Sequence, residues 1–327
     1  MKMIAAIIGM GIGQKHLDAI ENYKKSFVKI ICEKNEKKIK FLRKKYPDKI
    51  ITKNENIIFK DPSINLVSIA SYDDFHYLQV MKSLKANKNI IVEKPMCLKS
   101  NQLTEIYKIL KKKKNIKMTS NLVLRVNSLF KEFKKRIDIK NTFYIEADYI
   151  WGRKKKLFEW RSKVKDYSLI LGAGIHIVDL VMWILGSKPI SVITFANKKM
   201  TTKSKFKKNS LAVMLLEFPS NILVKITANG AAVHNHFHEM KIFSKNETLV
   251  HSNLGSYSFK KEKLKKIDKS YPDKQNRKKL IQNFIDNLTN PKIKNFISHQ
   301  EQFDLMSVCF SAEKSAMLKK KIRIKYL

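Results

Sequence analysis

The first 33 residues follow a pattern that few folds accommodate: an apolar run, a glycine-rich turn, a helix-like stretch, a second apolar run and an acid. Residues 3–8 (MIAAII) lead into Gly9-Met-Gly-Ile-Gly13, and residues 27–32 (FVKIIC) end at Glu33. Short, uninterrupted apolar runs are typical of strands buried on both faces. The pattern therefore predicts a parallel β-α-β unit at the start of the chain.

The same alternation continues through the next part of the chain. Further strands are expected at 49–52, 65–70, 90–94 and 116–120, with helices at 35–46, 73–86 and 101–114. Strands that alternate with helices predict a doubly wound parallel sheet with right-handed crossovers. This predicted Rossmann domain covers residues 1–121.

After residue 121 the pattern changes to runs that alternate polar and apolar positions, at 142–151, 190–196, 211–218, 222–228 and 236–243. Such alternation predicts strands with one buried face. Helices are expected at 124–137, 168–186, 275–289 and 299–318, a basic aromatic loop at 152–165 and a last strand at 322–326. Residues 122–327 are therefore expected to form an α+β domain on a large, mostly antiparallel open sheet.

The glycine-rich turn has the features of a dinucleotide site. Gly9 permits a tight turn, Gly11 lets the backbone approach a pyrophosphate, and the following helix supplies unpaired N–H donors. Glu33 would accept the ribose hydroxyls and repel a 2′-phosphate, which favours NAD over NADP. One feature departs from the usual fingerprint, because Gly13 comes one position early.

A second informative stretch is Ile90-Ile-Val-Glu-Lys-Pro-Met96, in which an apolar run stops at charged residues and a proline. Lys94 is expected at the carboxyl end of this strand, the edge where open parallel sheets bind ligands. Pro95 disfavours helical geometry at Lys94 and keeps the turn sharp. The alternative is a surface lysine that follows a core strand.

Composition limits the classes of partner. The 327 residues are 44% hydrophobic with a formal net charge of +39, and the basic residues are mostly lysine and scattered over the predicted helices. This distribution favours solvated faces over a dedicated nucleic-acid surface, although anionic substrates would be attracted. Salt-sensitive duplex binding through the lysine excess remains the alternative that this composition raises.

Two segments imitate membrane signals. Residues 1–9 resemble a secretory leader but run into glycines without a cleavage site, and residues 168–186 approach the length of a spanning helix. His176 and Asp179 at the centre of that helix would be costly in lipid, so we expect no membrane segment. The separated cysteines Cys32, Cys97 and Cys309 fit a reducing cytoplasm.

The chain resembles the glucose-fructose oxidoreductase, inositol dehydrogenase and MocA-like (Gfo/Idh/MocA) oxidoreductases. The resemblance covers nearly all of the chain. The motifs that carry it are the glycine loop followed by His16, Ser71-Tyr-Asp-Asp-Phe-His76, Glu93-Lys94-Pro95, Gly172-Ala-Gly-Ile-His176-Ile-Val-Asp179, and the closing helix with Met306-Ser-Val-Cys and Ala312-Glu-Lys-Ser315.

The resemblance implies Lys94 and His176 as active-site residues and a homodimer or homotetramer formed through the second domain's sheet. It also implies a cofactor pocket that includes Gly9, Gly11, Ile12, Gly13, Glu33, Ser71, His76, Glu93 and Lys94. His76 has the alternative of an ordinary residue at a helix start. Many family members have an aspartate four residues before the histidine, where this chain has Gly172.

Alcohol oxidation requires a base on the hydroxyl, and His176 is the first candidate because imidazole titrates near neutrality. Lys94, beside a positive nicotinamide, could share that role or polarise the forming carbonyl. Asp179, three residues after His176, projects from the same helix face and could orient the imidazole or bind a sugar hydroxyl. The alternative for His176 is a hydrogen-bonded core histidine.

Four further residues are candidate substrate contacts, since an arginine fork suits phosphate or carboxylate and an aromatic face suits a sugar ring. They are Arg125, Tyr149, Trp160 and Arg161, with domain packing as the alternative. His234, His236 and His238 alternate along a predicted strand. We expect an exposed or dimer-facing histidine row there and no metal, because Glu239 would point away from it.

The sequence therefore predicts a cytoplasmic, NAD-dependent oxidoreductase that acts on a hydroxyl or keto carbon of a sugar, cyclic polyol or nucleotide-linked sugar. The alternative is a catalytically silent dinucleotide-binding regulator or assembly partner with the same fold, for which Gly172 is the one supporting feature. The substrate, the direction of reaction and the oligomer size are left open by the sequence.

Overall fold

The computed structural model describes residues 2–327, apart from the side chains of Lys154 and Lys155. The chain separates into two compact units. Unit 1 consists of Met1–Val123 and Lys274–Gln302, and unit 2 consists of Leu124–Asp273 and Phe303–Leu327. The boundary after residue 123 is close to the expected one after 121. Residues 122–327 were expected to form one domain. The contacts instead place residues 274–302 in unit 1.

Unit 1 is built on a parallel sheet in the order β3-β2-β1-β4-β5-β6, so the predicted doubly wound sheet is confirmed. Its strands are β1 (Met3–Ile8), β2 (Ser26–Cys32), β3 (Ile50–Thr52), β4 (Leu66–Ile69), β5 (Asn89–Val92) and β6 (Met118–Ser120). Its helices are α1 (Gly13–Glu21), α2 (Glu36–Lys45), α3 (Asn56–Lys60), α4 (His76–Lys85), α5 (Ser100–Lys112) and α9 (Asn276–Thr289).

Helix α9 belongs to unit 1 because its apolar face completes the core beneath α1. Ile281, Phe284 and Ile285 are buried in the same cluster as Leu17 and Ile20 of α1. Asp286 at the edge of this contact accepts hydrogen bonds from Tyr23 and Lys25, each at 2.5 Å. The periodicity of residues 275–289 predicted the helix, but long-range packing decides the unit that it joins.

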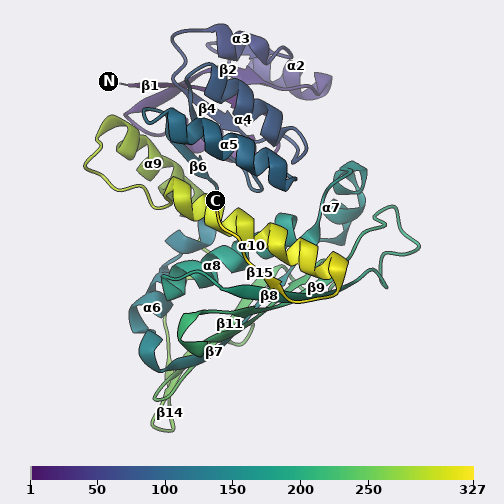
Figure 1. Ribbon diagram of the computed structural model, residues 1–327. Coiled ribbons are helices and arrows are strands. Elements are labelled where there is room, and N and C mark those ends of the chain that lie inside the picture. The colour runs from purple at the N-terminus through teal and green to yellow at the C-terminus, as the bar shows by residue number, and fades with distance from the viewer. Residues whose placement is uncertain (1) are drawn as a thin grey trace. The chain divides into compact units, whose positions relative to one another are not determined.

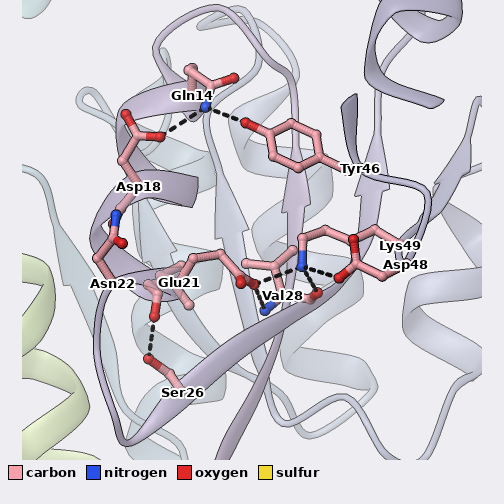
Figure 2. A network of polar contacts seen from close by, with 10 residues as sticks. Gln14, Asp18, Glu21, Asn22, Ser26, Val28, Tyr46, Asp48 and Lys49 are labelled. Atoms are coloured by element: carbon pink, nitrogen blue, oxygen red, sulfur yellow. Dashed lines mark hydrogen bonds and ion pairs between the residues drawn. The ribbon is translucent and has the colours of Figure 1, made fainter. Parts of the chain in front are cut away.

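Polar contacts fix the far end of α1 against the neighbouring strands (Figure 2). Lys49 donates to Glu21 at 3.0 Å and to the Val28 carbonyl at 3.1 Å, and the Val28 amide donates to Glu21 at 2.5 Å. Gln14 of the same helix donates to the Tyr46 hydroxyl at 3.0 Å. These contacts hold α1 in register with β2, and thereby fix the glycine turn at its amino end.

Unit 2 is built on a nine-strand mixed sheet in the order β14-β13-β12-β11-β7-β10-β9-β8-β15. The pair β7 and β10 is parallel and the other described pairs are antiparallel, which confirms the predicted mostly antiparallel sheet. Its strands are β7 (Thr142–Ile150), β8 (Ser191–Asn197), β9 (Leu211–Glu217), β10 (Leu223–Asn229), β11 (Phe237–Ser244), β12 (Thr248–Ser252), β13 (Gly255–Lys260), β14 (Lys263–Lys266) and β15 (Ile322–Arg323).

Helices α8 and α10 lie along one face of this sheet (Figure 1). The strands alternate buried and half-exposed residues because only that face is covered. The helical segments after residue 122 are η1 (Val123–Val126), α6 (Ser128–Arg136), η2 (Ile139–Asn141), α7 (Lys154–Phe158), η3 (Trp160–Lys163), the π-helical turn η4 (Ile170–Gly174), α8 (Ile175–Leu185), η5 (Pro219–Asn221) and α10 (His299–Leu318). The unit boundary falls within α10, after Gln302.

Several short elements were not predicted. Residues 152–165, expected as a loop, contain α7 and η3, and α3 and β12–β14 had no expectation. These elements are short, and β14 is fully exposed and rich in lysine, so apolar periodicity gives no signal for it. The last strand is shorter than expected, with only Ile322 and Arg323 paired.

A buried ion pair braces α8 in unit 2. Arg125 of η1 donates to both carboxylate oxygens of Asp179, from Nε at 3.0 and 2.9 Å and from Nη2 at 2.6 Å. Both side chains are almost fully buried. Removal of one partner from such a pair would leave an uncompensated buried charge, which costs about 3–5 kcal/mol.

Within residues 2–327 no helix is long and apolar enough to cross a membrane.

Candidate active site

The glycine turn of unit 1 lies between β1 and α1. Gly9 has φ +88°, and a Cβ at this position would lie 2.7 Å from the Ala70 carbonyl oxygen. Its amide donates to the Cys32 carbonyl at 2.8 Å, which ties the turn to the end of β2. A side chain at residue 9 would therefore be strained by its backbone and blocked by β4.

Gly11 and Gly13 differ in their surroundings. A Cβ on Gly11 would meet no atom within 4 Å, whereas one on Gly13 would lie 3.2 Å from Ile7 Cγ2 and 3.3 Å from the Ala70 Cβ. Gly13 thus provides the close approach of helix to strand, despite its early position in the sequence. The space above Gly11 is open on the side where a phosphate would approach the backbone.

The amino end of α1 has no side-chain cap, since Ile12 at the cap position is apolar and accepts no hydrogen bond. Its first amides are available to an anion. Glu33, at the end of β2, is buried and its carboxylate accepts from the amides of Met10 at 2.9 Å, Lys34 at 2.8 Å and Asn35 at 3.0 Å. The open space at Gly11, the uncapped helix and the fixed carboxylate together fit a dinucleotide.

Glu93 precedes Lys94 at the end of β5 and is the centre of a buried polar network. Its Oε1 accepts from His16 Nε2 at 3.0 Å and from Asn121 Nδ2 at 2.5 Å, and Arg277 Nε lies 3.5 Å away. The other ring nitrogen of His16 lies 2.7 Å from Ser68 Oγ. The network joins α1, β4, the ends of β5 and β6, and α9.

Burial alone would raise the pKa of Glu93, but the hydrogen bond from His16, the charge of Arg277 and the bond from Asn121 outweigh it and hold the pKa well below the ordinary carboxyl value. Glu93 is therefore a fixed anion. Because it is the residue next to Lys94, its network sets the backbone from which the half-buried lysine side chain projects.

His76 ties together the turns that follow β4 and β5. Its Nδ1 lies 2.7 Å from the Pro95 carbonyl oxygen and its Nε2 lies 3.2 Å from that of Ser71. A neutral imidazole donates to only one of them. The Ser71 hydroxyl donates to Gln79 at 2.6 Å. The predicted cofactor residues Ser71, His76, Glu93 and Lys94 thus lie at one edge of the sheet, which is the carboxyl edge of its strands.

In unit 2 the candidate substrate residues gather around Tyr149, near the end of β7. The His176 ring stacks on the Tyr149 ring with a centroid distance of 5.9 Å and an angle of 7° between the planes. His236 and His238 contact the same ring at 5.1 and 4.8 Å. Burial raises the pKa of Tyr149 to about 12, against the opposing charges of Arg153 and Arg161, so its phenol stays protonated.

Arg161 and Trp160 belong to the same group of residues. The guanidinium of Arg161 lies 4.0 Å from the centroid of the Trp160 ring and 4.9 Å from that of Trp151. Trp151 in turn contacts Tyr149 at 5.8 Å. The structure therefore brings Tyr149, Trp160, Arg161 and His176 together. Arg125 and Asp179 form their own buried pair, which favours the packing alternative for Arg125.

At Gly172, four residues before His176, the space for a side chain is already filled. A Cβ there would lie 2.0 Å from the hydroxyl oxygen of Tyr167 and 2.4 Å from its Cζ. The Tyr167 ring is buried and packs edge-on against Phe206 at 5.8 Å. A phenol hydroxyl thus occupies the position where an acid at residue 172 would begin.

The histidines expected as an exposed or dimer-facing row do not form an exposed row, because two of the three are covered. His238 is buried and pairs in register with Tyr149, and its Nδ1 contacts the Tyr271 hydroxyl. His236 is half-buried, and its Nδ1 lies 3.1 Å from the Trp151 carbonyl oxygen. Only His234 is exposed. The reason is that β11 lies beside β7 with these side chains on the helix-covered face.

Some residues contact the predicted site residues and hold them in place, but were given no functional role from the sequence. His16, Asn121 and Arg277 surround Glu93, and Trp151 and Tyr167 pack beside Arg161 and Gly172. Only His16 had a sequence signal, as part of the family motif. Within residues 2–327, no group of three or more His, Cys, Asp or Glu side chains is arranged to hold a metal ion.

Comparison with known proteins identifies the family. Residues 3–121 match the family model described as "Oxidoreductase family, NAD-binding Rossmann fold" (Gfo/Idh/MocA), and residues 134–310 match its "C-terminal alpha/beta domain". The chain belongs to the Gfo/Idh/MocA oxidoreductase family. Its members share the Rossmann unit that carries the glycine turn and the α/β unit that carries His176.

Solved structures of this family share the fold along the whole chain. A myo-inositol 2-dehydrogenase from Lactobacillus plantarum superposes with a TM-score of 0.86 at 17% identity, over 99% of this chain and 100% of that one. A scyllo-inositol dehydrogenase from Lactobacillus casei, solved with NAD(H) and scyllo-inositol, gives 0.83 at 15% identity, over 99% of each chain.

Curated relatives match over a shorter stretch. The Escherichia coli protein named "Uncharacterized oxidoreductase YhhX" is 25% identical over 130 residues, which span 39% of this chain and 37% of that protein. This chain therefore spans little more than a third of the length of that relative, which leaves activity and substrate to be argued from the site.

The buried histidines of unit 2 predict loss of stability in mild acid. Burial lowers the pKa of His251 to about 4, and burial with the charge of Arg153 lowers that of His236 to about 4. Burial also lowers the pKa of His238, with the charges of His236, His251 and Arg153 adding to it. The folded state therefore binds fewer protons than the unfolded state below about pH 6.5.

Stability of unit 2 should thus be full above about pH 6.5 and fall as the pH is lowered toward about 4, with His251 alone contributing roughly 2 kcal/mol of the loss at pH 5. Urea unfolding followed by tryptophan fluorescence measures this, because Trp151, Trp160 and Trp183 all belong to unit 2. His251→Gln should flatten the decline relative to its own stability at pH 8. Equal slopes in the variant and the wild type would contradict this assignment.

Proposed function

We propose that this protein is an NAD-dependent dehydrogenase that acts on a CH–OH group of a sugar, cyclic polyol or nucleotide-linked sugar. The observation that carries the proposal is that two reactive side chains each adjoin a residue held in place by buried contacts. Lys94 follows the Glu93 network in unit 1, and His176 stacks on Tyr149 in unit 2. Inositol dehydrogenases with the same fold support the substrate class.

In this proposal His176 removes the proton from the substrate hydroxyl, because imidazole is a base near neutral pH. Tyr149 holds the ring plane by stacking, and Lys94 donates a hydrogen bond to the oxygen as it becomes a carbonyl. The bound nicotinamide supplies the hydride acceptor. Trp160 and Arg161 offer a flat, positively charged wall to the ring of the substrate.

We further propose NAD in preference to NADP. Glu33 is held by three backbone amides at the end of β2, so its carboxylate is fixed where the adenosine ribose is expected. A 2′-phosphate there would meet a buried negative charge, whereas ribose hydroxyls would donate to it. Lys38 lies 3.7 Å from Glu33 Oε2 at the exposed edge and offsets only part of that charge.

The half-exposed face of the nine-strand sheet is proposed as the surface through which copies associate. Phe195 is 63% exposed, and Tyr144 stacks on Phe243 with ring centroids 5.7 Å apart on the same half-exposed face. Beside them Lys225 lies 3.4 Å from Asp148. Exposed aromatic residues on an open sheet face are typical of a protein interface.

The cysteines Cys32, Cys97 and Cys309 are buried and form no disulfide, which supports the proposed location in a reducing cytoplasm.

Lys94→Met and His176→Asn should each lower kcat by about 10²–10⁴-fold while NAD affinity changes little, because each removes a group that acts on the reacting oxygen. NADH production at pH 8 against inositols, hexoses and nucleotide sugars measures turnover, and calorimetry measures NAD binding. Lys85→Met, which removes an exposed lysine on α4, is the matched control.

Undiminished turnover in Lys94→Met would exclude Lys94 from the chemistry. Tight NAD binding with no turnover on any substrate would instead favour the catalytically silent regulator or assembly partner. Duplex DNA binding that is abolished by salt and unaffected by NAD would point to the nucleic-acid alternative.

Glu33→Ser should reduce the preference for NAD over NADP by at least about tenfold, because the fixed charge that repels a 2′-phosphate is removed. The ratio of the two dissociation constants, measured by calorimetry, is the readout. Lys38→Ser is the companion variant, and it should move the ratio in the opposite direction. An unchanged ratio in Glu33→Ser would reject the assigned role.

Phe195→Glu should shift the wild-type oligomer toward monomer, since it puts a charge into the proposed interface. Sedimentation velocity over a range of concentrations measures the change. Phe41→Glu, at a residue of unit 1 that is 58% exposed, is the control and should leave the oligomer intact. A wild-type protein that sediments as a monomer would dismiss the interface.

A further inference from the structure

A hollow in unit 2 lies where the end of β7 meets the segment before β11. It is shallow and open to solvent over most of its extent, has a volume of about 830 Å³, and is lined by Gly152, Arg153, Lys156, Ala232, Val233, His234 and Asn235. The size is within the range of small-molecule sites, which is about 300–1,000 Å³. It is therefore large enough for a substituted sugar.

Backbone packing builds this hollow. Gly152 has φ +59°, and a Cβ there would lie 2.1 Å from the His234 carbonyl oxygen and 2.6 Å from the His236 amide nitrogen. Because β7 and β11 are paired, with Ile150 opposite Phe237, the two segments emerge side by side. The close contact at Gly152 sets Arg153 beside His234 and Asn235.

The described side chains that line the hollow carry positive charge and no negative charge. Among its described lining residues none carries a carboxylate. Arg153 and Lys156 are exposed, and within residues 2–327 neither forms an ion pair with an acid. A guanidinium and an ammonium in one concave surface favour a phosphate or a carboxylate.

The hollow adjoins the rings around His176. His236, next to His234 and Asn235, contacts Tyr149, and Tyr149 stacks on His176. The positive charge of Arg153 contributes to the lowered pKa of His236 and opposes the raised pKa of Tyr149, so it is felt at both rings. An anion held at Arg153 would therefore lie on the far side of His236 and Tyr149 from His176, beyond two successive ring contacts of 5.1 and 5.9 Å.

We propose that this hollow is an anion subsite, which binds a phosphate or carboxylate group carried by the substrate. The inference rests on the proposed dehydrogenase function and narrows its substrate class to anionic sugars or polyols, including phosphate esters, sugar acids and nucleotide-linked sugars. Arg153 supplies a two-pronged donor, Lys156 a mobile charge and Asn235 a neutral amide at its wall.

The general lysine excess does not account for this site. The hollow is lined by Arg153 as well as by Lys156. Arginine is uncommon in this chain, because most of its 67 basic residues are lysines. Other arginines of the chain make geometrically demanding contacts, such as the fork of Arg125 on Asp179 and the stacking of Arg161 on Trp160. Arginine at residue 153 without a carboxylate partner in the described chain is consistent with a ligand as its partner.

The test is calorimetric titration of the full chain, with NADH present so that the glycine turn does not compete for phosphate. The probes are glucose 6-phosphate, glucuronate, glucose and inorganic phosphate. The variant is Arg153→Gln with Lys156→Gln, and the matched control is Lys198→Gln with Lys199→Gln, which removes two exposed charges from the end of β8.

At least one anionic sugar should bind at least about tenfold more tightly than glucose to the wild type, and that ratio should fall to near one in the Arg153/Lys156 variant only. A preference for the phosphate ester or for the acid identifies which anion the subsite takes. Equal affinities for anionic and neutral sugars in the wild type would overturn the proposal. Equal losses in the variant and the control would also overturn it, since the attraction would then arise from net charge.

The two proposals fail separately. Selective binding of an anionic sugar without NADH production on any substrate leaves the subsite in place and rejects the dehydrogenase. Turnover of a neutral sugar that is unaffected by added phosphate, with no anionic preference, keeps the dehydrogenase and rejects the subsite.

Discussion

A buried carboxylate sets the geometry of unit 1. Glu93 stands at the end of β5 and is bonded to His16 from α1 and Asn121 from the end of β6, with Arg277 of α9 at 3.5 Å. A buried charge is stable only when it is paired and hydrogen-bonded, so each of these elements is held in place by the same residue. The glycine turn lies just before the helix of His16, and Lys94 lies just after Glu93. One interaction therefore positions both the dinucleotide turn and the proposed catalytic lysine.

In unit 2, packed aromatic and imidazole rings surround His176, where unit 1 has a buried carboxylate. Here the rings of His176, Tyr149, His236 and His238 pack against one another, while the buried pair of Arg125 and Asp179 braces α8 behind them. Stacked rings lose little conformational entropy on binding and present flat surfaces, which suits a sugar ring. Charge is supplied at the margin of this ring group by Arg161 and Arg153. The arrangement separates an apolar, rigid interior from a positive rim, which explains how one site could combine ring recognition with anion attraction.

Predictions from the sequence were strongest where a local signal is decisive. The apolar runs of β1, β2, β4 and β5 and the periodicity of α4 and α5 placed the Rossmann sheet, because buried parallel strands leave no polar positions. The alternation of polar and apolar residues in β7 to β11 predicted the open sheet, because strands with one solvated face keep polar residues at every second position. Short elements such as α7 and β14 escaped, since too few residues repeat to show a period. The burial of His236 and His238 was missed because alternation shows which residues share a face and leaves open whether that face is covered.

By itself the sequence determined the order of the longer strands and helices, the glycine turn with its acid at Glu33, and the position of Lys94 at a strand end. These follow from local sterics and from the burial of short apolar runs. Tertiary structure alone decided that α9 completes unit 1, that Tyr167 fills the space at Gly172, and that Arg153 shares a hollow with Asn235. Each of these depends on which distant segments come into contact. Such contacts arise from close packing of whole surfaces, and a linear pattern carries no record of the partner.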